Sequence, residues 1–389
     1  MRLSVLLTLL GGCSIDASGL GERDAGEDAG TDSGIGTDSG TATDSATATD
    51  SGTATDSGAA TDGGSAPWWS PTFTRRRLLT FDNGMQDEDL DDFPVLIVLD
   101  GTRIDYATAR SAGEDIRFVD EDGATELAHE IEEWNESGVS VVWVKVPRID
   151  RRSGVDAIFM YWGDDTAPDT QSPAEVWSNG YEGVWHMETP GNSAGGPGVV
   201  VNGSSRTRGV IGDGRSFDGV DDYLDTRYDT DLATFTVSAW TLGRDPPGTG
   251  ISGPLLREEN FQICWDHQTP TYRGGVSLRV SGSWPAAAYG ALSTDTWYWL
   301  AGTYDGDTLR AYVDDRMTTE NAALSGPPDS SPHTATIARH PYRTSPHPFF
   351  RGSVDEARIE SVARSTAWMH AQYLSMTDAF IDFGPEERL

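Results

Sequence analysis

The chain contains few cysteines and few basic residues. Among its 389 residues only two are cysteines, Cys13 and Cys264, and 28 lysines and arginines stand against 62 aspartates and glutamates. Two cysteines exclude the multiple-disulfide framework of small secreted scaffolds. The formal net charge of −34, spread over the whole chain, argues against binding to the phosphate backbone of a nucleic acid. It suits neutral sugars or divalent cations, and equally an acidity that serves only solubility.

The sequence also has no hydrophobic run long enough to span a bilayer. Residues 1–12 combine an early Arg2 with a short apolar stretch and small residues, as secretory signals do. The ending Leu10-Gly11-Gly12-Cys13 resembles the bacterial lipobox, which implies that Cys13 is the lipidated first residue of the mature protein. The alternative is a chance cysteine behind a cytoplasmic N-terminus.

The residue after the predicted lipidation site bears on the location. In proteobacterial lipoproteins an Asp at this position resembles an inner-membrane retention signal, whereas here the residue is Ser14. We therefore expect a lipid anchor in the outer membrane with the protein exposed at the cell surface. A placement facing the periplasm is the alternative.

Residues 13–66 lack apolar periodicity and repeat a Thr-Asp pair every sixth residue. The repeated aspartates are Asp32, Asp38, Asp44, Asp50, Asp56 and Asp62. Such a segment has nothing to bury and gains no packing free energy to offset its chain entropy. The pattern predicts a disordered, self-repelling tether that spans on the order of 40 Å as a coil.

Residues 67–176 are expected to form a β-sandwich, because short period-2 or apolar runs follow one another at close spacing. One turn is expected near Tyr106–Ala112. The expected strands are Arg77–Phe81, Phe93–Leu99, Asp115–Asp120, Leu127–Trp134, Val139–Pro147 and Val155–Trp162.

Several of these runs resemble one bacterial family. They are Phe93-Pro94-Val95-Leu96-Ile97, Asp115-Ile116-Arg117-Phe118, Glu130-Ile131-Glu132-Glu133-Trp134, Val142-Trp143-Val144-Lys145-Val146-Pro147 and Met160-Tyr161-Trp162-Gly163. Together they resemble the domain of unknown function 2341. That family has no agreed activity, so the resemblance implies architecture but no chemistry.

Residues 177–389 carry five separated motifs in a characteristic order. They are Phe217-Asp218-Gly219-Val220-Asp221-Asp222-Tyr223, Phe235–Trp240, Trp297–Gly306, Leu309–Asp314 and Gly352–Ile359. Between about Trp177 and Phe383 the sequence resembles the laminin-G-like, concanavalin A-like jelly roll of bacterial surface proteins. The expected fold class is therefore all-β, with a disordered tether, an N-terminal β-sandwich and a C-terminal jelly roll.

The enzyme motifs that we sought are missing. There is no Gly-x-Ser-x-Gly elbow, and His129-Glu130 has no second histidine four residues on. The Glu-x-Asp-x-x-Glu pattern of jelly-roll glucanases is also absent, and retaining glycosidases need two close carboxylates. The nearest carboxylate cluster, Glu130-Ile131-Glu132-Glu133, alternates like a half-exposed strand. We expect no catalysis.

The jelly-roll resemblance implies a structural Ca²⁺ site. In related folds an aspartate of the closing strand and carbonyls near the Phe-Asp-Gly segment hold the ion, which prefers oxygen ligands. Asp355 matches the strand aspartate, and the Asp218-Gly219 turn matches the carbonyl donor. The alternative is that Asp355 pairs with Arg358 or caps the neighbouring loop.

Loop aromatics are the candidate ligand-binding residues, since aromatic rings beside polar groups suit carbohydrate. Trp265, His267 and Tyr272 surround one loop, and Tyr342 and Phe349 belong to another. The alternative is that they only cover the end of the sandwich. We interpret Trp240, Trp297, Trp299 and Cys264 as buried strand residues.

The sequence favours a non-catalytic surface lipoprotein whose partner is an extracellular glycan or a surface protein. A second hypothesis is a periplasmic scaffold that docks on an envelope complex. A third is a degenerate glycoside hydrolase. The missing carboxylate motif argues against the third.

Overall fold

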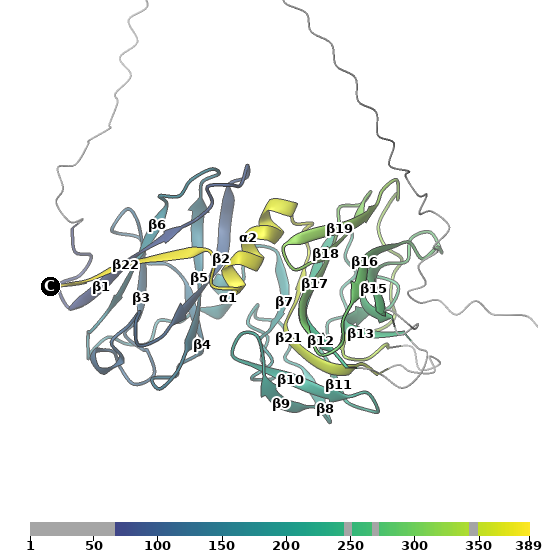
Figure 1. The fold of residues 1–389 in the computed structure, drawn as a ribbon, viewed down its shortest axis with the longest axis horizontal. Coiled ribbons are helices and arrows are strands. Elements are labelled where there is room, and N and C mark those ends of the chain that lie inside the picture. Colours follow the sequence, from purple (N-terminus) through teal and green to yellow (C-terminus); the bar gives the residue numbers. More distant parts are fainter. Residues whose placement is uncertain (1–66, 245–250, 267–271, 342–348) are drawn as a thin grey trace, which may run out of the picture. The chain divides into compact units, whose positions relative to one another are not determined.

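Six strands of the first β-sandwich are those expected from the sequence. The computed structural model describes residues 67–244, 251–266, 272–341 and 349–389, so Cys13 and the predicted tether lie outside the described residues. The strands are β1 (Arg75–Phe81), β2 (Leu90–Leu99), β3 (Arg117–Asp120), β4 (His129–Glu133), β5 (Ser140–Ile149) and β6 (Ala157–Trp162) (Figure 1). A short 3-10 turn at Tyr106–Thr108 occupies the expected turn. The predicted strands are confirmed, with small shifts at their ends.

The first sandwich takes its last strand from the opposite end of the chain. Its two sheets have the orders β22-β1-β6-β3 and β2-β5-β4, and β22 is Ile381–Arg388. In Figure 1 the yellow β22 runs beside the purple β1, with Phe383 opposite Leu79. Assigning all of residues 177–389 to the jelly roll was therefore wrong for β22. The physical reason is that β22 satisfies the hydrogen bonds of an otherwise open edge of β1.

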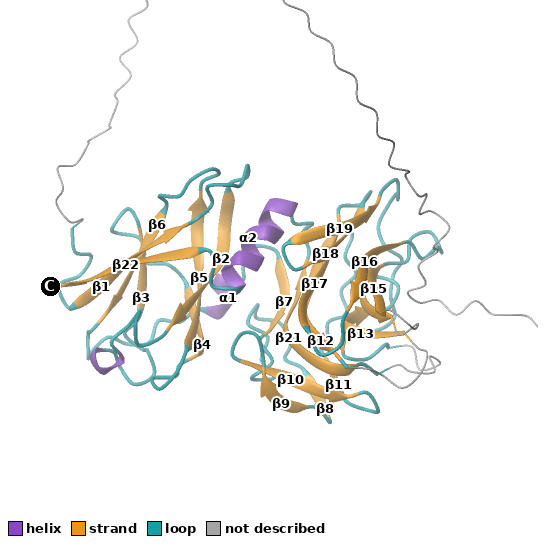
Figure 2. Cartoon of the chain, viewed as in Figure 1, coloured by secondary structure: helices purple, strands orange, loops and turns teal. Residues whose placement is uncertain are grey.

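Two further sheets form the jelly roll (Figure 2). One has the order β19-β18-β17-β12-β21-β10-β9, with β7 paired to β21, and the other has the order β16-β15-β14-β13-β20-β11-β8. The strands of the first sheet are β7 (Tyr181–Trp185), β9 (Ser205–Arg208), β10 (Asp213–Asp218), β12 (Phe235–Gly243), β17 (Trp297–Tyr304), β18 (Leu309–Val313), β19 (Arg316–Asn321) and β21 (Arg351–Glu360). Those of the second are β8 (Val200–Asn202), β11 (Tyr223–Asp225), β13 (Ile251–Arg257), β14 (Phe261–Asp266), β15 (Tyr272–Ser277), β16 (Ala286–Leu292) and β20 (Thr336–Ile337). The all-β fold class is confirmed.

The core of the jelly roll lies between its two sheets. Alternate residues of β12 (Phe235, Val237 and Ala239) are fully buried there with Leu300 and Ile359. Because side chains alternate along a strand, the residues between them face the outside of the sheet. Cys264 is fully buried as well, beside Leu256.

A helix covers that outer face. Trp240 and Trp299 are therefore buried beneath the helix and not between the two jelly-roll sheets. Helix α2 (Thr366–Met376), capped by the Ser365 hydroxyl, puts the Tyr373 ring 5.8 Å from Trp240. Its Trp368 ring lies 4.8 Å from Phe93 of β2. One hydrophobic cluster therefore continues from the first sandwich past α2 to the jelly-roll sheet. Trp240 and Trp299 are buried as predicted, but in this shared cluster, whereas Trp297 is only partly buried and packs against it.

Residues Trp68–Leu389 fall within one compact unit. A one-turn helix α1 (Pro173–Val176) precedes β7. Within the described part of the chain, no helix has both the length and the apolar character needed to cross a membrane.

Candidate functional site

The predicted calcium site is not formed by the residues proposed for it. In the ladder between β10 and β21, Asp218 lies opposite Arg351, four residues from Asp355 along the strand. At about 3.3 Å per residue this separation is about 13 Å, too far for one ion. One carboxylate oxygen of Asp355 instead accepts hydrogen bonds from the amides of Val210 and Ile211, both at 2.9 Å. Asp355 caps a loop, which was the alternative interpretation.

The Asp218-Gly219 turn is held by its own hydrogen bonds. Asp218 accepts from the amide of Val220 at 2.7 Å, and Asp222 accepts from the amide of Asp218 at 3.0 Å. Gly219 has a φ of 80°, which the turn requires. Asp218, Asp221 and Asp222 come close enough together to share a cation, but this turn is largely exposed. The carboxylates of Asp218 and Asp222 act as turn caps.

A β-bulge in β21 turns Glu356 out of the jelly-roll core. Ser238 of β12 lies opposite Arg358, and Trp240 lies opposite Asp355, so two residues of β21 oppose one of β12. Glu356, one of these two, has a φ of 49°. Asp355 and Glu356 are consecutive in the strand, yet both are fully buried and form polar contacts on the outer face of the sheet.

Glu356 belongs to a buried polar group around His186, the residue that follows β7. The Nδ1 atom of His186 lies 2.5 Å from a carboxylate oxygen of Glu356 and 3.3 Å from one of Glu132. Its Nε2 atom lies 3.4 Å from Glu130. We call Glu130, Glu132, His186 and Glu356 the His186 cluster.

Four further groups surround the His186 cluster. The indoles of Trp143 and Trp177 donate hydrogen bonds of 2.7 Å to Glu132 and Glu130 respectively. The Ser193 hydroxyl donates to the other oxygen of Glu130 at 2.6 Å. Arg358, fully buried, lies 2.6 Å from Glu356 and stacks on both indole rings. The carboxylates are thus fixed by neutral donors and by one guanidinium.

Burial and mutual repulsion set the proton affinities in this group. For Glu132, burial and the nearby Glu356 hold the pKa well above its usual range. Burial opposes the charged form of His186, but the carboxylates of Glu356, Glu132 and Glu130 outweigh it and raise its pKa well above the usual value. Burial also opposes the ionised form of Glu356, yet His186 and Arg358 lower its pKa.

The residues predicted to bind a ligand have mixed outcomes. Trp265 is wrong as a ligand residue, because it is fully buried in the jelly-roll core with its ring 6.0 Å from that of Phe350. His267, Tyr342 and the side chain of Tyr272 lie outside the described residues. Phe349 is partly exposed.

Phe349 forms a small surface group with two residues that the sequence did not single out. Its ring lies 6.2 Å from that of Tyr223, at the start of β11. The guanidinium carbon of Arg339 lies 4.3 Å from the centre of the Tyr223 ring, and Arg339 pairs with Phe349 in an isolated β-bridge. All three side chains are partly exposed. We call Tyr223, Arg339 and Phe349 the aromatic platform.

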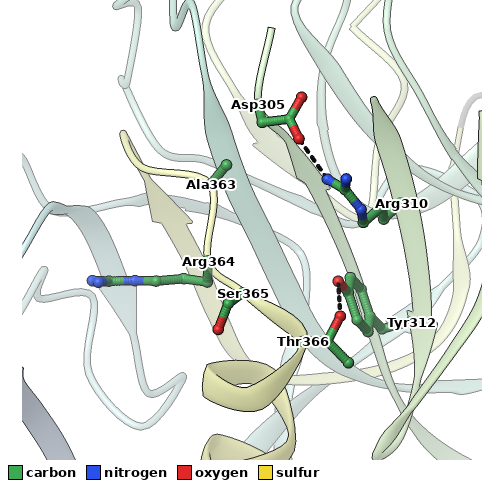
Figure 3. Close-up of a pocket in the computed structure, with 7 residues that line it drawn as sticks. All are labelled: Asp305, Arg310, Tyr312, Ala363, Arg364, Ser365 and Thr366. Carbon is green, nitrogen blue, oxygen red and sulfur yellow. Dashed lines mark hydrogen bonds and ion pairs between the residues drawn. The ribbon is translucent and has the colours of Figure 1, made fainter. Parts of the chain in front are cut away.

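A separate pocket of about 330 Å³ lies between β18 and the start of α2. Figure 3 shows Arg310 directed at Asp305, a pair separated by 2.6 Å, and the Tyr312 hydroxyl next to Thr366 at 3.2 Å. Arg364 extends away from both. Because Tyr312 is only 1 % exposed, the pocket presents hydroxyl and charged groups but no ring face.

Two family models match separate regions of the chain. Residues 112–191 match the family model of a domain of unknown function (DUF2341), and residues 218–369 match that of the concanavalin A-like lectin/glucanases superfamily. The chain thus contains a region that matches DUF2341, followed by a region that matches the concanavalin A-like superfamily. The DUF2341 match extends beyond the boundary expected at residue 176 and includes His186 with Glu130 and Glu132.

Solved structures resemble half of the chain at low identity. Domain 4 of AbnA, an extracellular arabinanase from Geobacillus stearothermophilus, in complex with arabinotriose, is 15% identical over 51% of this chain and 97% of that one, with a TM-score of 0.40. The binding domain of Paraclostridial Mosquitocidal Protein 1 is 11% identical over 50% of this chain and 52% of that one, with a TM-score of 0.41. No curated protein matches the chain.

Parts of the His186 cluster can be recognised in the sequence, but not the whole. Glu130 and Glu132 were interpreted as a half-exposed strand, whereas Glu130 is buried and the side chain of Glu132 is 2 % exposed. Their spacing of two residues did place them on one face of β4. Nothing in the sequence pointed to His186, because its partners lie 54 and 170 residues away.

Proposed function

We propose that the concanavalin A-like domain binds an extracellular glycan without catalysis, through the aromatic platform. The observation that carries this proposal is the pair of partly exposed rings of Tyr223 and Phe349 with a guanidinium beside them. Sugar rings present C–H edges to aromatic faces and hydroxyls to polar groups, so rings next to fixed donors suit them. Membership of the lectin and glucanase superfamily supports the same class of ligand.

Arg339 is the polar group that gives this surface its chemistry. Among the described residues, no carboxylate lies within ion-pairing distance of its guanidinium, whose recorded side-chain contact is the Tyr223 ring. Stacking on that ring restrains the side chain while its N–H donors stay available for a ligand.

The pocket beside α2 is the less suitable surface. Its guanidinium, from Arg310, is already paired with Asp305, and its one aromatic side chain, Tyr312, is buried. A glycan there would have to break an ion pair without gaining a stacking face. The pocket therefore supplies the matched control.

The test is a glycan array probed with the full-length chain, followed by calorimetry with the strongest hit. Phe349→Ala and Arg339→Ala should each weaken binding about tenfold or more, as truncation of a central contact residue does. Arg310→Ala, in the pocket, should leave affinity unchanged. Loss of binding only in Arg310→Ala would move the site to the pocket, and an array without hits would overturn the proposal.

We further propose that the protein is an outer-membrane lipoprotein anchored through Cys13. Support comes from the lipobox-like Leu10-Gly11-Gly12-Cys13 sequence in front of the acidic repeat. Radiolabelled palmitate should label the wild-type protein, and Cys13→Ser should be unlabelled and released from membranes. A labelled or membrane-retained variant would contradict the anchor.

A further inference from the structure

One nitrogen of His186 faces two carboxylates at once. Its Nδ1 lies 2.5 Å from Glu356 and 3.3 Å from Glu132, and a ring nitrogen carries at most one hydrogen. The opposite nitrogen, Nε2, already faces the carboxylate of Glu130. If Nε2 carries the hydrogen and donates it to Glu130, the lone pair of Nδ1 points at two anions. The contacts of Nδ1 are satisfied either by a hydrogen that it donates to Glu356 or by a cation that it shares with the two carboxylates.

The Glu130 contact matches the way proteins orient a metal-binding histidine. A histidine that ligates through one ring nitrogen usually donates the other N–H to a carboxylate, which fixes the tautomer. Glu130 is itself fixed by Trp177 and Ser193. The second layer of hydrogen bonds around a metal ligand is thus already present on this side of the ring.

Charge and hydrogen bonding point the same way. Four buried carboxylates lie here, the fourth being Asp355, while Arg358 is the permanent cation in contact with them. A divalent cation would supply two positive charges to balance these buried carboxylates, as protonation of His186 and of a carboxylate would in its absence. The Oε2 atom of Glu132, which lies 3.3 Å from Nδ1, accepts from Trp143, whereas the other oxygen, Oε1, is buried and has no hydrogen-bond partner. It is the kind of unfilled acceptor that a cation would satisfy.

We propose that Glu132, His186 and Glu356 bind one divalent transition-metal ion of the Zn²⁺ type. Their ligand atoms all lie within 4.8 Å of one another. A tetrahedral ion with bonds near 2.05 Å separates its ligands by about 3.3 Å, which is the distance between Nδ1 and Glu132; the 2.5 Å between Nδ1 and Glu356 would have to lengthen by about 0.8 Å on binding. An imidazole with two carboxylates suits zinc, whereas Ca²⁺ takes six to eight oxygen ligands.

The ion would join the two family domains. Glu132 lies on β4 of the first sandwich, His186 follows β7, and Glu356 sits at the bulge of β21. The left-handed φ of Glu356 is a strained conformation for a residue with a side chain, and such residues occur where a site requires them. Here the strain directs the carboxylate at His186.

The first experiment measures metal on the tag-free, full-length chain. After purification and dialysis, mass spectrometry should find about one zinc per chain, and chelation should lower the melting temperature by about 5 °C. Titration of the metal-free protein should show one tight site for Zn²⁺ and none of comparable affinity for Ca²⁺. Absence of a Zn²⁺ site in this titration would overturn the proposal.

Variants then locate the ion. Glu132→Gln and Glu356→Gln should each weaken Zn²⁺ binding at least about 100-fold, because loss of an outer hydrogen-bond partner alone costs about 10–100-fold. Glu130→Gln should fall in that smaller range. Asp221→Asn, in the exposed acidic turn, is the matched control and should bind as the wild type does. Tight binding retained by both ligand variants would place the ion elsewhere.

A spectroscopic measurement keeps the proposal testable if a variant does not fold. X-ray absorption at the zinc edge of the wild-type protein should show one imidazole together with oxygen ligands at about 2.0 Å. A first shell without imidazole, or one with more than one, would exclude the His186 cluster without any substitution.

Discussion

His129 and His186 are both buried, yet their surroundings are opposite. His129, on β4, is 1 % exposed, its ring lies 5.6 Å from that of Phe118, and burial with the nearby Arg117 lowers its pKa to about 4. His186 is 9 % exposed and faces three carboxylates, which raise its pKa well above the usual value. The same side chain is thus neutral in one place and cationic, or bound to a cation, in the other.

The two histidines differ in charge because they lie at opposite faces of strand β4. Along β4, His129 points toward the interior of the first sandwich, and Glu130 and Glu132 point to the opposite face. The interior is apolar and excludes charge, whereas the opposite face collects it. The comparison teaches that burial favours a neutral histidine, as at His129, unless neighbouring carboxylates outweigh it, as at His186.

The largest expected effect on stability is in the His186 cluster, the charged member of this comparison. In a chelating buffer, Glu356→Ala should reduce the free energy of unfolding by about 3–5 kcal/mol, because it leaves Arg358 buried without its carboxylate. Chemical denaturation measures the loss. Glu133→Ala is the matched control on β4, since its partner Arg208 is largely exposed, and it should cost about 0–1 kcal/mol. Equal losses of stability in Glu356→Ala and Glu133→Ala would contradict the idea that the buried ion pair matters more than the exposed one.

A pH series tests whether His129 is neutral in the folded protein. Because the pKa of His129 is lowered by folding to about 4, its contribution is complete above the unfolded value of 6.5 and is lost as the pH falls toward 4. This loss should reach about 3 kcal/mol. Unfolding free energies of the wild type and His129→Gln, measured from pH 7 to 4, should converge by that amount. Parallel curves would show that His129 is not held neutral.

A smaller effect is expected at the outer layer of the His186 cluster. Ser193→Ala removes the hydroxyl that donates to Glu130 at 2.6 Å and should cost about 1.5–3 kcal/mol, as loss of a hydrogen bond to a charged group does. Thermal unfolding is sufficient to detect it. An unchanged stability would mean that water replaces the hydroxyl and that Glu130 is less enclosed than the contacts indicate.

The smallest effect is expected in the exposed acidic turn. Asp221→Asn should change the unfolding free energy by less than about 0.5 kcal/mol, because that carboxylate is exposed to solvent. Denaturation with and without Ca²⁺ checks it. A larger loss of unfolding free energy that appears only with Ca²⁺ would reveal a cation bound in the turn. The exposed turn would then resemble the buried His186 cluster more closely.

Much of the fold could be predicted from the sequence, because local patterns specify strands. The six strands of the first sandwich follow from apolar alternation, and the jelly roll follows from the motif order that ends in β21. The place of β22 could not be predicted in this way. Its pairing with β1 joins residues about 300 positions apart, and nothing local records which open edge a strand will fill.

The sequence by itself determined the all-β class, the two family regions and the spacing that puts Glu130 and Glu132 on one face. Only the tertiary structure decided that Trp265 is core, that Phe349 joins Tyr223 and Arg339, and that His186 meets Glu132 and Glu356. The physical reason is that a strand's period fixes the direction of a side chain but not its partner. The partner depends on the bulge in β21 and on packing between segments distant in the chain.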